Sequence, residues 1–172
     1  AHIQELLTQN DLPDSGLKFI LTGGFSADGY SVEKSNLILN QSYFKMERDK
    51  IQTPLKLMSY SHQRQIPEVK TIDYLQAIRL QPKMKMSGAD DILYRNQDYI
   101  RECPRANIFM IKGNQIITPK HEILHGITRS KILSMNISNY EILEQDFTLN
   151  DLYSADEVFI SSSTKNATSV GY

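Results

Sequence analysis

The sequence contains few of the features that would place it in a specialised class of protein. Its single cysteine, Cys103, excludes an intramolecular disulfide and favours a reducing compartment, for which we predict the cytoplasm. No apolar run approaches the ~20 residues that cross a bilayer, so we expect no membrane segment. The 19 Lys and Arg residues are balanced by 20 Asp and Glu residues, giving a net charge of -1. Without a basic excess, nucleic acid is not an expected partner.

The sequence does contain enough apolar residues for a buried core. Its 172 residues, of which 40% are hydrophobic, suit one domain or one domain with part of a second. Residues 1–7 have the pattern of the last turns of a helix already under way, and the chain stops directly after a predicted strand. We therefore predict that both ends are cut from a longer protein.

Strand and helix patterns alternate along the chain, which predicts a mixed α and β fold (class α/β). Strands are predicted at residues 17–22, 36–40, 57–60, 89–94, 107–111, 116–117, 140–143 and 158–160. A helix is predicted from Thr71 onward, with Thr71 as its N-cap and Ile72, Leu75 and Ile78 on one side, and another at residues 126–135. The polar stretch at residues 41–54 is the predicted linker.

Polar residues at predicted strand ends and helix starts are the candidates for chemistry. They are Lys70, Glu102, the pair at residues 127–128 and the Ser-rich run at residues 161–164. Each has an ordinary interpretation when taken alone: a solvated lysine, a surface carboxylate, a helix cap and a loop.

In their order along the chain, these segments form a more specific pattern. Residues 69–75 read VKTIDYL, residues 102–109 read ECPRANIF, residues 123–129 read ILHGITR and residues 159–164 read FISSST. The ordered set resembles the class IV aminotransferases, a family that includes branched-chain and D-amino acid aminotransferases and aminodeoxychorismate lyase. Residues 21–30 are similar to the end of the family's smaller N-terminal domain.

The resemblance implies a fold, a cofactor and a set of site residues. Residues 46–172 would form the C-terminal cofactor-binding domain of the D-amino acid aminotransferase-like fold, with a barrel-like mixed sheet and surrounding helices. Residues 1–45 would be the end of a truncated N-terminal α+β domain. The implied cofactor is pyridoxal 5'-phosphate (PLP). Lys70 would be its Schiff-base lysine, Glu102 the partner of its ring nitrogen, and Leu124 the residue against its ring. The residues implied for its phosphate are Gly126, Ile127, Thr128, Ser162 and Ser163.

Several other residues have open or negative interpretations. Arg105 lies in the loop after Glu102 and would either bind a substrate carboxylate or face solvent. Asp73 stands where relatives commonly carry Asn. His62 and Arg64 border the active site in relatives, where a substrate role is one open interpretation, although solvated side chains are more common. His121 and His125 are four apart but lack a third ligand, so no metal is predicted. Cys103 has no partner His and is not a predicted nucleophile.

The predicted activity follows from the resemblance. It is amino transfer between an amino acid, branched-chain or D-configured, and a 2-oxo acid. Two alternatives stay open: a 4-amino-4-deoxychorismate lyase that releases pyruvate, and a non-catalytic fragment that keeps the fold. The resemblance also implies a homodimer.

Overall fold

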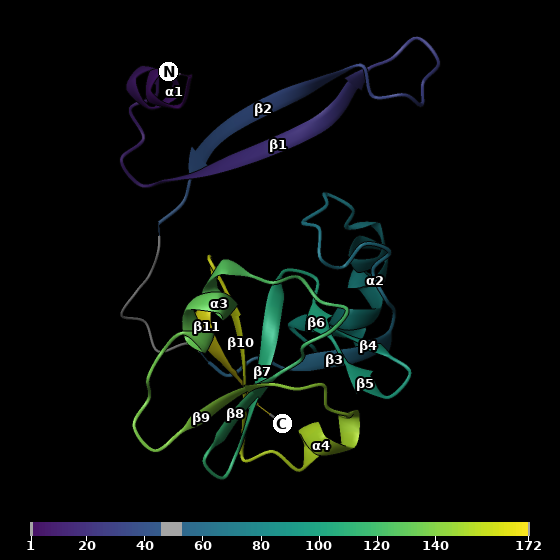
Figure 1. Cartoon of the computed structure of the whole chain (residues 1–172), viewed down its shortest axis with the longest axis vertical. Coiled ribbons are helices and arrows are strands. Elements are labelled where there is room, and N and C mark those ends of the chain that lie inside the picture. The colour runs from purple at the N-terminus through teal and green to yellow at the C-terminus, as the bar shows by residue number, and fades with distance from the viewer. Residues whose placement is uncertain (1, 46–52, 172) are drawn as a thin grey trace. The chain divides into compact units, whose positions relative to one another are not determined.

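The chain folds into two compact units, Ala1–Lys50 and Ile51–Tyr172. They are seen in a computed structural model that describes residues 2–45 and 53–171 (Figure 1). The predicted domain boundary between residues 45 and 46 lies at the edge of the described residues. Each unit is considered by itself below.

The first unit is a helix followed by a long antiparallel hairpin. It comprises α1 (His2–Gln9), β1 (Ser15–Phe25) and β2 (Lys34–Tyr43). The predicted strands at residues 17–22 and 36–40 are confirmed, paired with Phe19 opposite Leu39 and Leu21 opposite Leu37. Gly24 sits at a bulge with φ +74, where an added Cβ would lie 1.7 Å from the Lys34 carbonyl oxygen. Only glycine fits there.

The second unit combines two sheets with short helices, which confirms the mixed α and β class. The larger sheet has the order β11-β10-β7-β8-β9, with β6 also pairing with β7, and the smaller has the order β3-β4-β5. The β8–β9 and β3–β4 pairs are parallel and the others are antiparallel. The strands are β3 (Leu57–Ser61), β4 (Asp91–Asn96), β5 (Tyr99–Ile100), β6 (Glu102–Cys103), β7 (Ala106–Lys112), β8 (Gln115–Thr118), β9 (Glu141–Glu144), β10 (Glu157–Ser162) and β11 (Asn166–Val170). The helices are α2 (Leu75–Met86), α3 (Ile127–Leu133) and α4 (Leu149–Tyr153).

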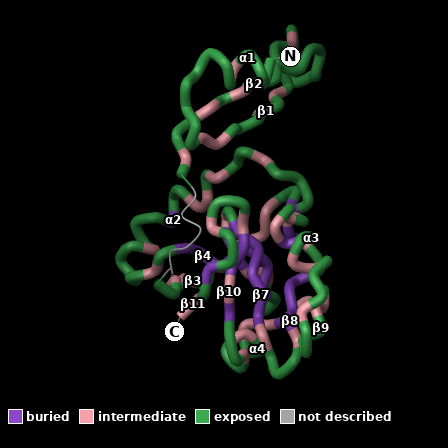
Figure 2. Tube along the Cα trace, turned by 90° about the vertical axis from the view of Figure 1, so that its left-hand side faces the viewer, coloured by how far each residue is buried: buried purple, intermediate pink, exposed green. Residues whose placement is uncertain are grey.

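The main core lies around β7, whose first five residues are all buried. Figure 2 shows buried backbone running along β7, β8, β10 and β4. Ile108 and Ile160, opposite each other on β7 and β10, are both 0% exposed. A smaller core forms where α2 covers β4, with Leu80, Ile92 and Tyr94 buried together. No helix in the described ranges is long and apolar enough to cross a membrane.

The helix predicted from Thr71 begins four residues later than expected. Its N-cap position is Tyr74, and the Asp73 carboxylate accepts a hydrogen bond from the Leu75 amide at 3.1 Å. The prediction of Thr71 as the cap was therefore wrong, because a local Asp–amide bond starts the helix instead. Ile72, Leu75 and Ile78 are 64%, 73% and 59% exposed, and the buried residue of α2 is Leu80. The helix predicted at residues 126–135 is confirmed as α3, with Gly126 at its N-cap position.

Replacing Ile108 with Ala tests the position of the main core. Ile108 is 0% exposed, so truncation leaves a cavity and should lower the free energy of unfolding by about 2–5 kcal/mol in urea denaturation. Met135→Ala is the control, because Met135 is 56% exposed and should change stability by less than ~0.5 kcal/mol. Equal losses in the two variants would contradict this core assignment.

Candidate active site

A cavity of about 560 Å³ opens in the second unit. The site residues predicted from the sequence all line it: Lys70, Glu102, Arg105, Leu124, Gly126, Ile127, Thr128, Ser162 and Ser163. They come from segments spread over nearly a hundred positions of the chain, so the fold brings together what the sequence keeps apart.

The start of β7 organises this cavity. Asn107 is paired with Glu102 of β6 on one edge and with Ser161 of β10 on the other. In Figure 1, β6 and β10 accordingly lie on opposite sides of β7. The Glu102 carboxylate and the loop after β10 are therefore presented at the same end of the sheet.

Glu102 is a buried carboxylate with a donor on each oxygen. It is 5% exposed. Its Oε1 accepts a bond from Arg64 Nε at 2.9 Å, and its Oε2 accepts one from the Leu124 amide at 3.0 Å. Burial raises the pKa of Glu102, while the charge of Arg64, the bonds from Leu124 and Arg64, and the charge of Lys70 oppose that rise. The outcome is a carboxylate whose position is fixed at the cavity wall.

Arg64 is more central than the sequence indicated. Besides Glu102, its guanidinium donates to the backbone carbonyls of Val69, at 3.1 Å, and Pro67. One side chain thus ties Glu102 to the segment that leads directly into Lys70. The interpretation of Arg64 as a solvated residue was wrong, because its side chain is only 17% exposed and donates three hydrogen bonds.

Gly126 is required by a close approach. An added Cβ would lie 2.3 Å from Asn107 Oδ1, far inside contact distance. The same Asn107 donates through Nδ2 to the Leu124 carbonyl at 2.7 Å. Its side chain therefore binds the loop at Leu124 and lies against Gly126. Because Gly126 occupies the N-cap position of α3 and has no side chain, no side-chain cap competes for the first amides of α3.

The loop after β10 carries the hydroxyls on another wall. Ser162 Oγ accepts a bond from the Lys165 amide at 3.1 Å, and Lys165 Nζ pairs with Asp91 of β4. The loop is thereby anchored to the smaller sheet. Ser161 Oγ is buried and has no hydrogen-bond partner among residues 53–171.

One aromatic ring of the cavity wall, that of Tyr94, was not singled out from the sequence. Tyr94, 3% exposed, has its pKa raised to about 12, chiefly by burial, so its hydroxyl stays protonated. The His62 ring packs edge-on against it with centroids 4.8 Å apart, and burial lowers the pKa of His62. No local pattern marks Tyr94, because any large apolar residue satisfies the same buried strand position.

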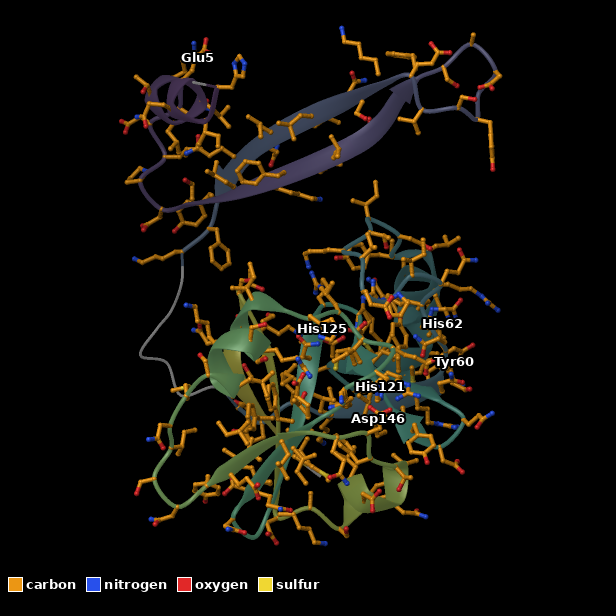
Figure 3. All side chains as sticks on the ribbon, in the orientation of Figure 1. Glu5, Tyr60, His62, His121, His125 and Asp146 are labelled. Atoms are coloured by element: carbon orange, nitrogen blue, oxygen red, sulfur yellow. The ribbon has the colours of Figure 1, made fainter. Side chains whose placement is uncertain are left out.

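The remaining sequence candidates are two histidines and the cysteine. His121 Nδ1 contacts Asp146 at 3.1 Å (Figure 3), whereas His125 lines the cavity. Among the described residues, no group of three or more His, Cys, Asp and Glu side chains could hold a metal ion. Cys103 is 1% exposed, and burial raises the pKa of its thiol well above the ordinary value, which makes a poor nucleophile.

Known proteins similar to this chain come from one family. The sequence profile of the class IV aminotransferases matches residues 1–171. Branched-chain-amino-acid aminotransferase 1 of Arabidopsis thaliana mitochondria is 36% identical over 105 residues, which cover 58% of this chain and 27% of the relative. D-alanine aminotransferase of Listeria monocytogenes is 36% identical over 106 residues, which cover 60% and 37%.

Solved structures share the fold. A Legionella pneumophila protein provisionally assigned as a 4-amino-4-deoxychorismate lyase superposes with a TM-score of 0.88 and 28% identity, covering 98% of this chain and 65% of that protein. The branched-chain amino acid aminotransferase of Escherichia coli gives a TM-score of 0.75 at 23% identity, covering 97% and 59%. The chain thus spans 27% to 37% of the two curated relatives and about 60% of these structures.

Replacing Arg64 with Gln tests the ion pair at Glu102. Without Arg64 the pKa of Glu102 should rise further, because burial is then less opposed. A carboxyl with a raised folded-state pKa stabilises the fold while protonated, and this contribution is lost as pH rises through that pKa. The variant should therefore lose stability relative to the parent as pH rises above the ordinary Glu range, reaching about 3–5 kcal/mol when Glu102 is ionised.

Urea denaturation across pH measures this effect. Arg95→Gln is the matched control, because Arg95 donates to the Gln97 carbonyl rather than to a carboxylate. Its stability should follow the pH profile of the parent. An Arg64→Gln profile parallel to that of the parent would exclude the proposed electrostatic role of Arg64.

Proposed function

We propose, since the chain belongs to the class IV aminotransferase family, that its second unit binds pyridoxal phosphate and serves amino transfer between an amino acid and a 2-oxo acid. The observation that carries the proposal is the fixed Glu102 carboxylate in the same cavity as Lys70. An amine and a buried, hydrogen-bonded carboxylate are the two groups that this chemistry requires of the protein.

The residues present fit the cofactor. Lys70 lines the cavity and supplies the amine for covalent attachment. Glu102 supplies a charged acceptor for a protonated ring nitrogen, whose added positive charge would favour the ionised carboxylate. When bound, pyridoxal phosphate supplies an aldehyde carbon that accepts the amino group and a ring that withdraws electrons from the substrate. Leu124, held through its amide by Glu102, packs against the ring in this proposal.

Neutral donors are proposed to hold the phosphate. The hydroxyls of Thr128, Ser162 and Ser163 line the cavity, as do Gly126 and Ile127 at the start of α3. Hydroxyl and amide groups donate well to a phosphate dianion. The Lys165–Asp91 pair would keep the serine loop in place when the anion binds.

Lys70 is also the proposed proton carrier. With the cofactor bound, the Lys70 amine would serve as the base for the proton on the substrate Cα. Arg64 assists indirectly, because it binds the carbonyls of Pro67 and Val69 just before Lys70 and so limits the movement of that backbone. Its contact with Glu102 links the backbone before Lys70 to the carboxylate proposed for the ring nitrogen.

The lyase remains the alternative activity, because the Legionella protein with the 0.88 TM-score is provisionally assigned to that reaction. A fragment without catalysis is the third candidate, since the chain spans only 27% to 37% of two curated relatives. Branched-chain or D-amino acids are the proposed substrates, in line with what those two relatives are named for.

Two further parts of the proposal concern assembly and location. We propose a homodimer, supported by the exposed apolar side chains of Ile72, Leu75 and Ile78 beside Lys70. Apolar groups gathered in this way are typical of surfaces that bind another protein. The cytoplasm stays the predicted compartment, in keeping with a buried and unpaired Cys103 thiol.

Reduction with borohydride in the presence of pyridoxal phosphate tests the cofactor assignment. We expect one stable adduct on Lys70 by peptide mass spectrometry, because at substoichiometric cofactor the site that binds pyridoxal phosphate most tightly should hold most of the C=N bonds that borohydride reduces. Lys70→Ala should lose the adduct, while Lys83→Ala, a change on exposed α2, should retain it. Adducts spread over several surface lysines would refute the site.

An assay of the reaction separates the two activities. With an amino donor and a 2-oxo acid acceptor, we expect amino transfer that depends on the acceptor and is at least ~100-fold slower in Lys70→Ala, as for loss of a general base. Release of pyruvate from aminodeoxychorismate without an acceptor would favour the lyase. Neither activity, with an intact Lys70 adduct, would leave the binding fragment as the function.

A further inference from the structure

Arg105 is a cavity arginine that has no hydrogen bond or ion pair in the described part of the second unit. It lines the cavity and is exposed. The other arginine of the cavity wall, Arg64, is bound to Glu102 and to backbone carbonyls. The cavity carboxylates are engaged elsewhere, since Glu102 is held by Arg64 and Asp73 accepts the Leu75 amide.

The turn that carries Arg105 is rigid and well placed. Cys103 and Ala106 pair across it, so Pro104 and Arg105 form a two-residue connection between β6 and β7. The proline ring fixes one backbone angle of this turn, and both flanking residues are buried. The turn lies at the end of β7 where β10 leads into the Ser162–Ser163 loop on the opposite edge. Arg105 therefore lines the cavity from a short turn between two paired strands, with an exposed guanidinium side chain.

We propose that Arg105 binds the carboxylate of the substrate and so restricts the site to amino and 2-oxo acids in preference to simple amines and ketones. This inference rests on the proposed function. Lys70 is committed to the cofactor there and the phosphate has three hydroxyl donors, which leaves Arg105 as the guanidinium available to a second anion. A guanidinium matches a carboxylate with two parallel N–H donors.

Chemical-shift titration of the ¹⁵N-labelled chain, with and without pyridoxal phosphate, tests this. The probes are butanoate and butanamide, which differ in charge but hardly in shape. Butanoate should shift the Arg105 Nε–H signal and the Ala106 and Ser163 amides, and butanamide should not. Arg105→Gln should weaken butanoate binding, followed at the two amides, by at least about tenfold, as expected for loss of a charge-assisted bond. Arg105→Lys should fall between.

Arg79→Gln is the matched control, because Arg79 is exposed on α2 and is not part of the cavity lining. It should bind butanoate as the parent does, and all variants should bind pyridoxal phosphate with affinities within about twofold of the parent. Equal butanoate affinity in the parent and Arg105→Gln would overturn the proposal, as would equal binding of butanamide. Weaker cofactor binding with unchanged butanoate binding would assign Arg105 to the phosphate instead. Butanoate binding that depends on Arg105, in a chain without a Lys70 adduct, would refute only the proposed function.

Discussion

The buried charge of Glu102 is the constraint on which the cavity depends. A carboxylate that is 5% exposed destabilises a fold unless donors replace the lost water. Here Oε1 accepts from Arg64, and Oε2 accepts from the Leu124 amide and, at 3.5 Å, from Asn107 Nδ2. The two shorter bonds come from different segments, Arg64 before Lys70 and Leu124 before α3. Satisfying one carboxylate therefore positions both segments against β6. The same group that would meet a cofactor also sets the geometry of its surroundings.

The buried strands that the sequence predicted correctly carry an apolar run. β7 contains Ile108 and Phe109, both 0% exposed, and its hydrophobic run alone indicates a buried strand. The elements that were missed are short and depend on partners. β6 has two residues and exists because Glu102 and Cys103 pair with β7, while α4 starts at a capping box between Thr148 and Asp151. Such local or long-range bonds leave little periodic signal.

The residues of the site also fall into those that the sequence predicted and those that it did not. Its residues were predicted only through their order along the chain, since Lys70, Glu102 and Ser162 each have an ordinary interpretation when alone. The contact between Arg64 and Glu102 could not be predicted, because the two residues are 38 positions apart and no residue between them indicates it. Tyr94 was missed for a different reason: its ring satisfies the strand pattern, and only the fold places its wall position next to His62.

Arg64 and Arg105 are both arginines of the cavity, but one is bonded within the protein and the other is exposed. Arg64 is 17% exposed, and its donors are used by Glu102 and by two carbonyls, so its charge is neutralised within the protein. Arg105 is exposed on its turn, and its guanidinium donates to no group within residues 53–171. A buried ion pair resists exchange because breaking it leaves an uncompensated charge, whereas an exposed arginine can be replaced at little cost to the fold. In the proposed site, Arg64 would support the structure and Arg105 would provide selectivity, so that the second could vary while the first is retained.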